Sequence, residues 1–267
     1  MNNRLFRDVI LPVAFYAFLL YVSQLVVGLA LEIVYVASQT GQSLSDAVAN
    51  ASETLLTQVS LITIAGDVLA LLAVFIISRI KKVSFTGFTS LNGRISVKTV
   101  LLMLVAGFAF NLWISFLLSY LPIPASAMGV YEEVSEFLDE DGVFAVLSSV
   151  LVAPVVEEIY FRGLIYKHFR ICMPEYAAVV LQALVFAAFH GPSAVWMSYA
   201  FLAGLLFGYA GMLTGGIRAC IMLHAAFNAA SYLLDLLPDG PLFTVLLVLS
   251  PVLLIWSVFS LLRETNK

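Results

Sequence analysis

Residues 153–164 read A-P-V-V-E-E-I-Y-F-R-G-L and place three ionisable side chains inside a run of chain that is long and apolar enough to cross a bilayer. At the centre of a membrane-spanning helix, Glu157, Glu158 and Arg162 would each cost about 2.5–3.5 kcal/mol on the mildest insertion scale. Such residues occur where they pair with one another, line a wet cavity or take part in chemistry. The segment therefore indicates a membrane protein with a polar site inside it.

The composition of the whole chain agrees with this interpretation. Of 267 residues, 62% are hydrophobic and only 11% are charged, with a mean hydropathy of +1.02, whereas soluble domains carry about 25% charged residues. A membrane-spanning helix needs about 20 apolar residues. On this basis we predict an all-α membrane bundle, embedded in the lipid bilayer, with eight spans at about 9–36, 55–79, 97–121, 143–168, 174–190, 194–213, 217–235 and 241–262.

The basic residues indicate an orientation for this bundle. Twelve of the 13 Lys and Arg residues lie in the two terminal segments and the even-numbered connections between spans, and the thirteenth is Arg162. The odd-numbered connections (38–54, 122–142, 191–193 and 236–240) contain none. Lys and Arg accumulate on the cytoplasmic side of membrane proteins, so we predict that both termini are cytoplasmic. With no basic stripe in the sequence, a nucleic-acid partner is not expected.

The external connection 122–142 is strongly acidic. Its carboxylates are Glu132, Glu133, Glu136, Asp139, Glu140 and Asp141. A solvated loop or surface helix is the plainer interpretation. A docking patch for a cationic partner is the alternative.

Several polar residues inside the spans have simpler roles. Asn111 and Gln182 are typical of hydrogen bonds between membrane helices. Asp67, near the middle of the second span, must be protonated or paired, and it serves either the structure or the site. Cys172 and Cys220 both fall on the predicted cytoplasmic side, so no disulfide is expected.

The helical periodicity predicts different roles for the two adjacent glutamates. Adjacent helical residues point about 100° apart, so Glu157 and Glu158 cannot face one partner. Glu158 and Arg162 stand at i and i+4, a spacing that permits an ion pair along one helix face. We therefore predict a structural or electrostatic role for Glu158 with Arg162, and a chemical role for Glu157.

Two further pairs repeat the i,i+4 spacing, namely Phe186 with His190 and His224 with Asn228. A carboxylate and an imidazole that meet in a dry cavity can hold and deprotonate a water molecule. A second histidine and an amide can supply hydrogen-bond donors to an oxyanion. No serine or cysteine stands beside these residues as an obvious nucleophile, so the chemistry that fits is attack of water on a peptide bond.

Each of these motifs has an ordinary structural explanation when taken alone. A single membrane-embedded histidine usually serves packing, and a Glu–Arg pair often locks one helix. The occurrence of three such motifs in nearby spans favours a shared site.

The motifs E-E-x-x-x-R, F-x-x-x-H and H-x-x-x-N, in this order, resemble the CAAX protease and bacteriocin-processing (CPBP) family of intramembrane proteases, which includes the type II CAAX prenyl endopeptidase. The resemblance covers residues 140–235. The three N-terminal spans and the acidic loop (1–130) precede this core, and the last span and tail (241–267) follow it. We expect all three parts to form a single membrane domain. It implies an eight-helix bundle with catalytic water at Glu157 and His190, an oxyanion site at His224 and Asn228, and supporting roles for Glu158, Arg162 and Phe186. It further implies a location in the bacterial plasma membrane and a substrate that is a membrane-associated peptide or protein, lipidated or a bacteriocin-like precursor.

Three alternatives stay open at the level of sequence. No cofactor is expected, but Glu157, His190 and His224 could bind zinc in a metal-dependent version of the same protease. A non-catalytic immunity or maturation factor would keep the fold with a vestigial site. A transporter is disfavoured because the first four spans show no repeat in the last four. For a protease, we expect the site to open toward the cytoplasm or laterally to lipid.

Overall fold

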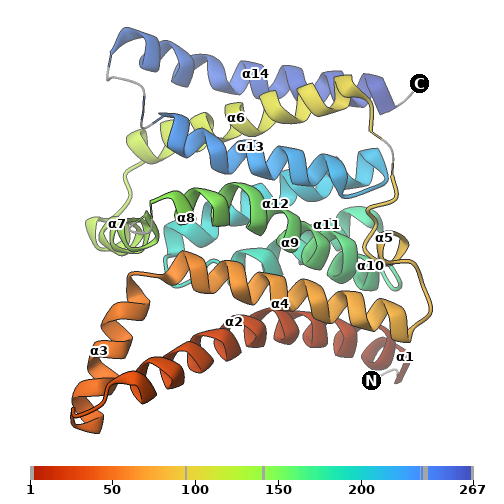
Figure 1. Ribbon diagram of the computed structural model, residues 1–267. Helices are drawn as coiled ribbons and strands as arrows, with labels where there is room; N and C mark the ends of the chain where they lie inside the picture. The colour runs from red at the N-terminus through yellow and green to blue at the C-terminus, as the bar shows by residue number, and fades with distance from the viewer. Residues whose placement is uncertain (1–2, 94, 140–141, 235, 237–239, 266–267) are drawn as a thin grey trace.

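The computed structural model describes residues 3–93, 95–139, 142–234, 236 and 240–265, and these residues form an all-helical bundle (Figure 1). Three segments, labelled η, have the wider π-helical winding. The elements in chain order are α1 (Asn3–Leu5), η1 (Phe6–Ile10), α2 (Leu11–Ser38), α3 (Leu44–Leu56), α4 (Val59–Ile80), α5 (Phe85–Phe88), α6 (Val97–Tyr120), α7 (Ala125–Asp139), α8 (Val143–Val146), η2 (Leu147–Val152), α9 (Ala153–Glu157), η3 (Glu158–Ile165), α10 (Tyr166–Phe169), α11 (Glu175–Ala188), α12 (Ala194–Thr214), α13 (Arg218–Leu234) and α14 (Pro241–Thr265).

Six continuous helical stretches of the described chain are long and apolar enough to cross a membrane. They are Phe6–Ser38, Val59–Ile80, Val97–Tyr120, Val143–Phe169, Ala194–Thr214 and Phe243–Thr265. The two other predicted spans are helical but short, with 14 residues in α11 and 17 in α13. At 1.5 Å per residue, α11 is about 21 Å long, less than the roughly 30 Å of a bilayer core. The all-α class is therefore confirmed, and the count of eight spans stays a prediction.

Two of the predicted outer connections contain helices of their own. α3 occupies the first, and Ser43 caps it by accepting a hydrogen bond from the backbone N–H of Asp46 at 3.2 Å. The second predicted span consequently begins at Val59, later than expected. The acidic connection forms α7, a helix where the domain prediction had a loop, and Glu132 and Glu133 are exposed on it. The acidic residues 140–141 lie outside the described part of the chain.

Small residues and buried amides hold the bundle together. Gly204 and Gly208 of α12 lie against α11, where a Cβ atom on Gly204 would come within 2.9 Å of Ala183. Small residues on this face thus let the two helices approach closely. Gln182 of α11 donates to the Gly204 carbonyl at 2.8 Å, and Asn111 of α6 donates to Ser231 of α13 at 2.9 Å. The interhelical hydrogen bonds predicted for both amides are therefore present.

The bundle has two distinct ends. At one end, where both chain termini lie in Figure 1, Lys98 pairs with Glu264 at 2.7 Å and Lys167 donates to the Phe88 carbonyl at 2.7 Å. We call this the basic end. At the opposite end, α7 packs on the start of α12 through Tyr131. We call this the α7 end.

Candidate active site

Glu158 is the centre of a buried polar cluster. The side chain is 0% exposed, and its Oε1 accepts hydrogen bonds from Arg162 Nη1 and from His224 Nδ1, each at 2.9 Å. The predicted ion pair along the helix is thus present. The bond from His224 was not predicted from the sequence, because it forms only when α13 docks against η3.

Arg162 extends this cluster to two more helices. Its Nη2 donates to the Gly204 carbonyl at 3.3 Å, and its guanidinium carbon lies 4.3 Å from the Phe186 ring centroid and 5.4 Å from that of Phe207. A guanidinium over an aromatic face is favourable where water is excluded. Glu158 and Arg162 therefore fix η3, α11, α12 and α13 relative to one another.

Glu157 and Glu158 both approach His224, Glu158 at Nδ1 and Glu157 on the Nε2 side, which corrects the expectation that they cannot face one partner. The Glu157 side chain is 23% exposed, and its Oε2 lies 3.9 Å from His224 Nε2, beyond hydrogen-bond distance. Within the described chain, Oε2 has no hydrogen-bond partner. Because this oxygen is itself buried, a water molecule or a substrate group would reach the carboxylate through the exposed part of the side chain.

The two site histidines each have one ring nitrogen occupied. His190 follows the end of α11, and its Nδ1 lies 2.8 Å from the Phe186 carbonyl oxygen, which can only accept. Nδ1 of His190 therefore carries the hydrogen, and in the neutral ring Nε2 carries the lone pair. The same reasoning applies to His224, whose Nδ1 donates to the Glu158 carboxylate. Both imidazoles are thus held in the tautomer whose Nε2 can accept a proton.

Asn228 is held in place by a backbone carbonyl that the neighbouring helix leaves free. In η2, the Ala153 N–H bonds to the Ser148 carbonyl, five residues earlier. The next bond in this register would run from residue 154 to the Ser149 carbonyl, but Pro154 has no N–H. Asn228 Nδ2 donates to that Ser149 carbonyl at 2.6 Å instead. Its second N–H remains available to a ligand.

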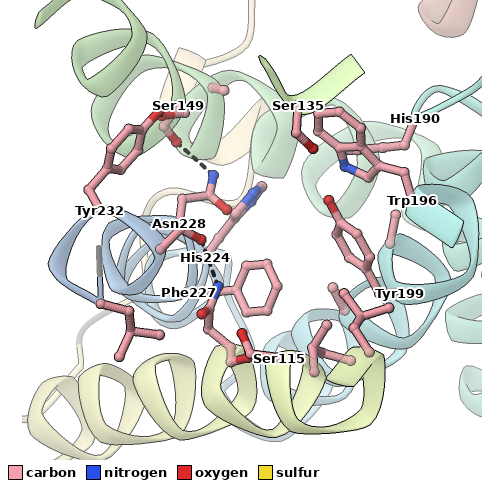
Figure 2. Close-up of a pocket in the computed structure, with 18 of the residues that line it drawn as sticks. Ser115, Ser135, Ser149, His190, Trp196, Tyr199, His224, Phe227, Asn228 and Tyr232 are labelled. Atoms are coloured by element: carbon pink, nitrogen blue, oxygen red, sulfur yellow. Dashed lines mark hydrogen bonds between the residues drawn. The ribbon is translucent and has the colours of Figure 1, made fainter. Parts of the chain in front are cut away.

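A single cavity of about 850 Å³ joins these groups (Figure 2). Across it, His224 and Asn228 face His190, Trp196 and Tyr199. The predicted site residues that line it are Glu157, Phe186, His190, His224 and Asn228, while Glu158 and Arg162 lie behind its wall.

The remaining wall was not predicted from the sequence. It is formed by aromatic and small polar side chains, and the lining includes Asn111, Ser115, Tyr131, Ser135, Ser149, Trp196, Tyr199, Phe227, Ser231, Tyr232 and Phe243. Asn111 Oδ1 is buried there and has no hydrogen-bond partner among the described residues. Aromatic side chains with a few polar groups among them are typical of ligand-binding cavities.

Asp67 remains separate from the cavity. It is buried and accepts a hydrogen bond from Gln24 at 3.2 Å, which joins α4 to α2. Asp67 was predicted to serve either the structure or the site, and its hydrogen bond to Gln24 supports the structural role.

The site offers few donor atoms to a zinc ion. Among the described residues, no three His, Cys, Asp or Glu side chains gather as a metal-ligand group. His224 Nδ1 is committed to Glu158, which leaves Nε2 as its one free ligand atom. Both the metal-free mechanism and the zinc-dependent alternative stay predictions.

Comparison with known proteins supports the sequence resemblance. Residues 139–230 match the family described as Type II CAAX prenyl endopeptidase Rce1-like. The match includes all seven motif residues and nearly coincides with the predicted 140–235 core. Comparison with curated proteins and with solved structures gives no match.

Proposed function

We propose that this chain is an intramembrane endopeptidase in which Glu157 and His190 activate water. The proposal starts from residues 139–230, which match the type II CAAX prenyl endopeptidase family. The matched family is one of endopeptidases, and the six long apolar helices mark an integral membrane protein. The observation that carries the proposal is the meeting of Glu157, His190, His224 and Asn228 on one cavity.

In the proposed reaction, a water molecule lies between the Glu157 carboxylate and His190 Nε2. Glu157 takes a proton as the water oxygen forms a bond to the scissile carbonyl carbon, and the carbonyl oxygen becomes an oxyanion. When the C–N bond breaks, the departing nitrogen receives the proton that Glu157 holds. The products are an amine and a carboxylic acid, which loses its proton to solvent, and Glu157 is again deprotonated.

Asn228 is the principal oxyanion donor in this scheme. Its free N–H is a donor in every protonation state, and the Ser149 carbonyl orients the amide before the substrate arrives. His224 Nε2 can donate to the oxyanion only when the ring is doubly protonated, since Nδ1 already donates to Glu158. Donors placed in advance toward developing charge are among the largest contributions to catalysis.

We further propose that α11 and α13 complete an eight-helix membrane domain with both termini in the cytoplasm. Their shortness fits this arrangement, because a turn inside the membrane is tolerated where it lines a protein cavity. The plasma membrane of a bacterial cell is the proposed location. The substrate is a membrane-associated peptide or protein, and both a lipidated segment and a bacteriocin-like precursor fit this class.

The test is cleavage by the purified protein in detergent. A mixture of internally quenched peptides should be cut by the wild type and by Glu53→Gln, a matched change of an exposed carboxylate on α3. Glu157→Gln should lose cleavage by at least about 10³-fold while it keeps the wild-type elution profile. Wild-type turnover by Glu157→Gln would refute the role of this carboxylate. A folded wild type that cleaves none of the peptides would favour the non-catalytic maturation or immunity factor.

A further inference from the structure

The active-site cavity occupies only one half of the bundle. In each long helix that lines it, the lining residues lie toward the α7 end: residues 111–118 in the second half of α6, residues 196–207 in the first two thirds of α12, and residues 224–234 in the last two thirds of α13. Further lining residues are Tyr131 and Ser135 of α7 itself and Phe243 at the start of α14. The cavity thus runs from the depth of Glu157 to the α7 end.

The basic residues lie at the opposite helix ends. Outside the membrane-embedded Arg162, the described Lys and Arg residues are Arg4, Arg7, Arg79, Lys81, Lys82, Lys98, Lys167, Arg170, Arg218 and Arg263. Arg218 is the first residue of α13, and Asn228 is ten residues further along, or about 15 Å toward the α7 end. Between the cavity and the basic end lie fully buried apolar side chains of the core, including Leu164, Ile165 and Ile217.

Charge assigns these two ends to the two sides of the membrane. The four connections at the α7 end hold nine Asp and Glu residues and no Lys or Arg. A bias this complete places the basic end in the cytoplasm. The cavity, contrary to the opening expected from the sequence, then faces away from the cytoplasm.

The α7 end also has a definite charge. α7 supplies Tyr131 and Ser135 to the cavity wall, and it carries the exposed Glu132 and Glu133 on its other faces, about 100° and 200° around the helix from Tyr131. Among the described lining residues, Glu157 is the one acidic side chain, and none is Lys or Arg. An end of the bundle with an excess of carboxylates attracts positively charged substrates and repels negatively charged ones.

We propose that the cavity receives its substrate from the extracytoplasmic side, and that this substrate is a positively charged segment of an exported or membrane-anchored polypeptide. The proposal rests on the peptidase function above and specifies its substrate class. A cytoplasmic protein that presents its C-terminus at the inner surface would meet the closed, basic end of the bundle.

Thiol labelling tests the face without any substrate. The exposed Cys172 at the basic end reports on the cytoplasm, while Cys220 is fully buried. In intact cells, a membrane-impermeant maleimide should label Ser135→Cys in a Cys172→Ser background, and should leave wild-type Cys172 unlabelled until the membrane is permeabilised. Labelling of Cys172 in intact cells, with Ser135→Cys protected, would overturn the proposal.

Sealed vesicles test the substrate class. The probes are two quenched peptide mixtures with the same randomised centre, one flanked by lysines and one by glutamates. Right-side-out vesicles should cleave the lysine-flanked mixture at least about 10-fold faster than the other, and the ratio should fall as salt screens the charges. Inside-out vesicles should cleave neither mixture until detergent is added. Cleavage by inside-out vesicles alone, or equal rates for both mixtures, would overturn the proposal.

The two hypotheses fail in different ways. If the wild type cleaves neither mixture in detergent, the peptidase function fails, and the substrate class fails with it. The labelling of Ser135→Cys still decides which face the cavity opens on. If cleavage occurs in detergent but only inside-out vesicles are active, the peptidase function stands and the proposed face is refuted.

Discussion

The Glu158 cluster predicts that two neighbouring carboxylates respond oppositely to the same substitution. Glu158→Gln removes the charge that receives hydrogen bonds from both Arg162 and His224, and it leaves a buried guanidinium without its counterion. Breaking a buried ion pair in this way costs about 3–5 kcal/mol. Glu157→Gln removes no hydrogen bond within the described residues, and we expect it to change the unfolding free energy by less than about 1 kcal/mol.

These energies translate into a measurable difference in melting temperature. For a chain of this size, 1 kcal/mol corresponds to roughly 2–4 °C. The Glu158→Gln variant should therefore melt about 6–20 °C below the wild type. The Glu157→Gln variant should melt close to the wild type. Because Cys220 is fully buried, a fluorogenic thiol reagent in a Cys172→Ser background reports on opening of the core.

The pair can be examined further with Arg162→Ala. Alone it should destabilise the protein as strongly as Glu158→Gln does. The double variant should be clearly more stable than the sum of the two single losses predicts, because the interaction can be lost only once. Melting temperatures of Glu158→Gln and Glu157→Gln that agree within about 2 °C would refute the assignment of Glu158 as the buried centre.

Three other predictions concern the oxyanion donor, the helix contact and the metal. Asn228→Ala should lower kcat by about 10²–10³ with little change in KM. The control Ser149→Ala keeps the backbone carbonyl that holds Asn228, and its kcat should stay within about 10-fold of wild type. Equal kcat for Asn228→Ala and wild type would exclude the oxyanion role. Gly204→Val should prevent the close approach of α11 to α12 and lower the melting temperature far more than Gly129→Val, where a Cβ meets nothing within 4 Å; similar melting temperatures would contradict this packing. Prolonged chelation should leave peptide cleavage unchanged, and activity that zinc removal abolishes and zinc addition restores would establish the metal-dependent mechanism instead.

The class of fold follows from composition, but helix lengths do not. Hydropathy marks apolar runs, and it therefore identified the runs that become α11 and α13. It could not show that α11 ends at Ala188, because that end depends on the turn that places His190 against Phe186. It likewise missed α3, whose mixed sequence is helical through its Ser43 cap.

Local spacing predicts the part of the site that lies on one helix. The Glu158–Arg162 pair follows from the i,i+4 rule. The bonds that join helices could not be found this way, because they depend on docking. His224 with Glu158 is one such bond, and Asn228 with the Ser149 carbonyl is another. Pro154 was a signal for the second, since a proline in a helix frees a carbonyl.

The most direct test of the central claim is a double-mutant comparison of Glu157 and His190 on cleavage of one peptide in detergent. If both residues activate the same water, Glu157→Gln and His190→Gln should each reduce kcat/KM by at least about 10³-fold. The double variant should be no more than a few-fold slower than the worse single variant, since residues that act as a unit are strongly non-additive. Losses that multiply in the double variant, or a His190→Gln enzyme with wild-type turnover, would contradict activation of a shared water at this site.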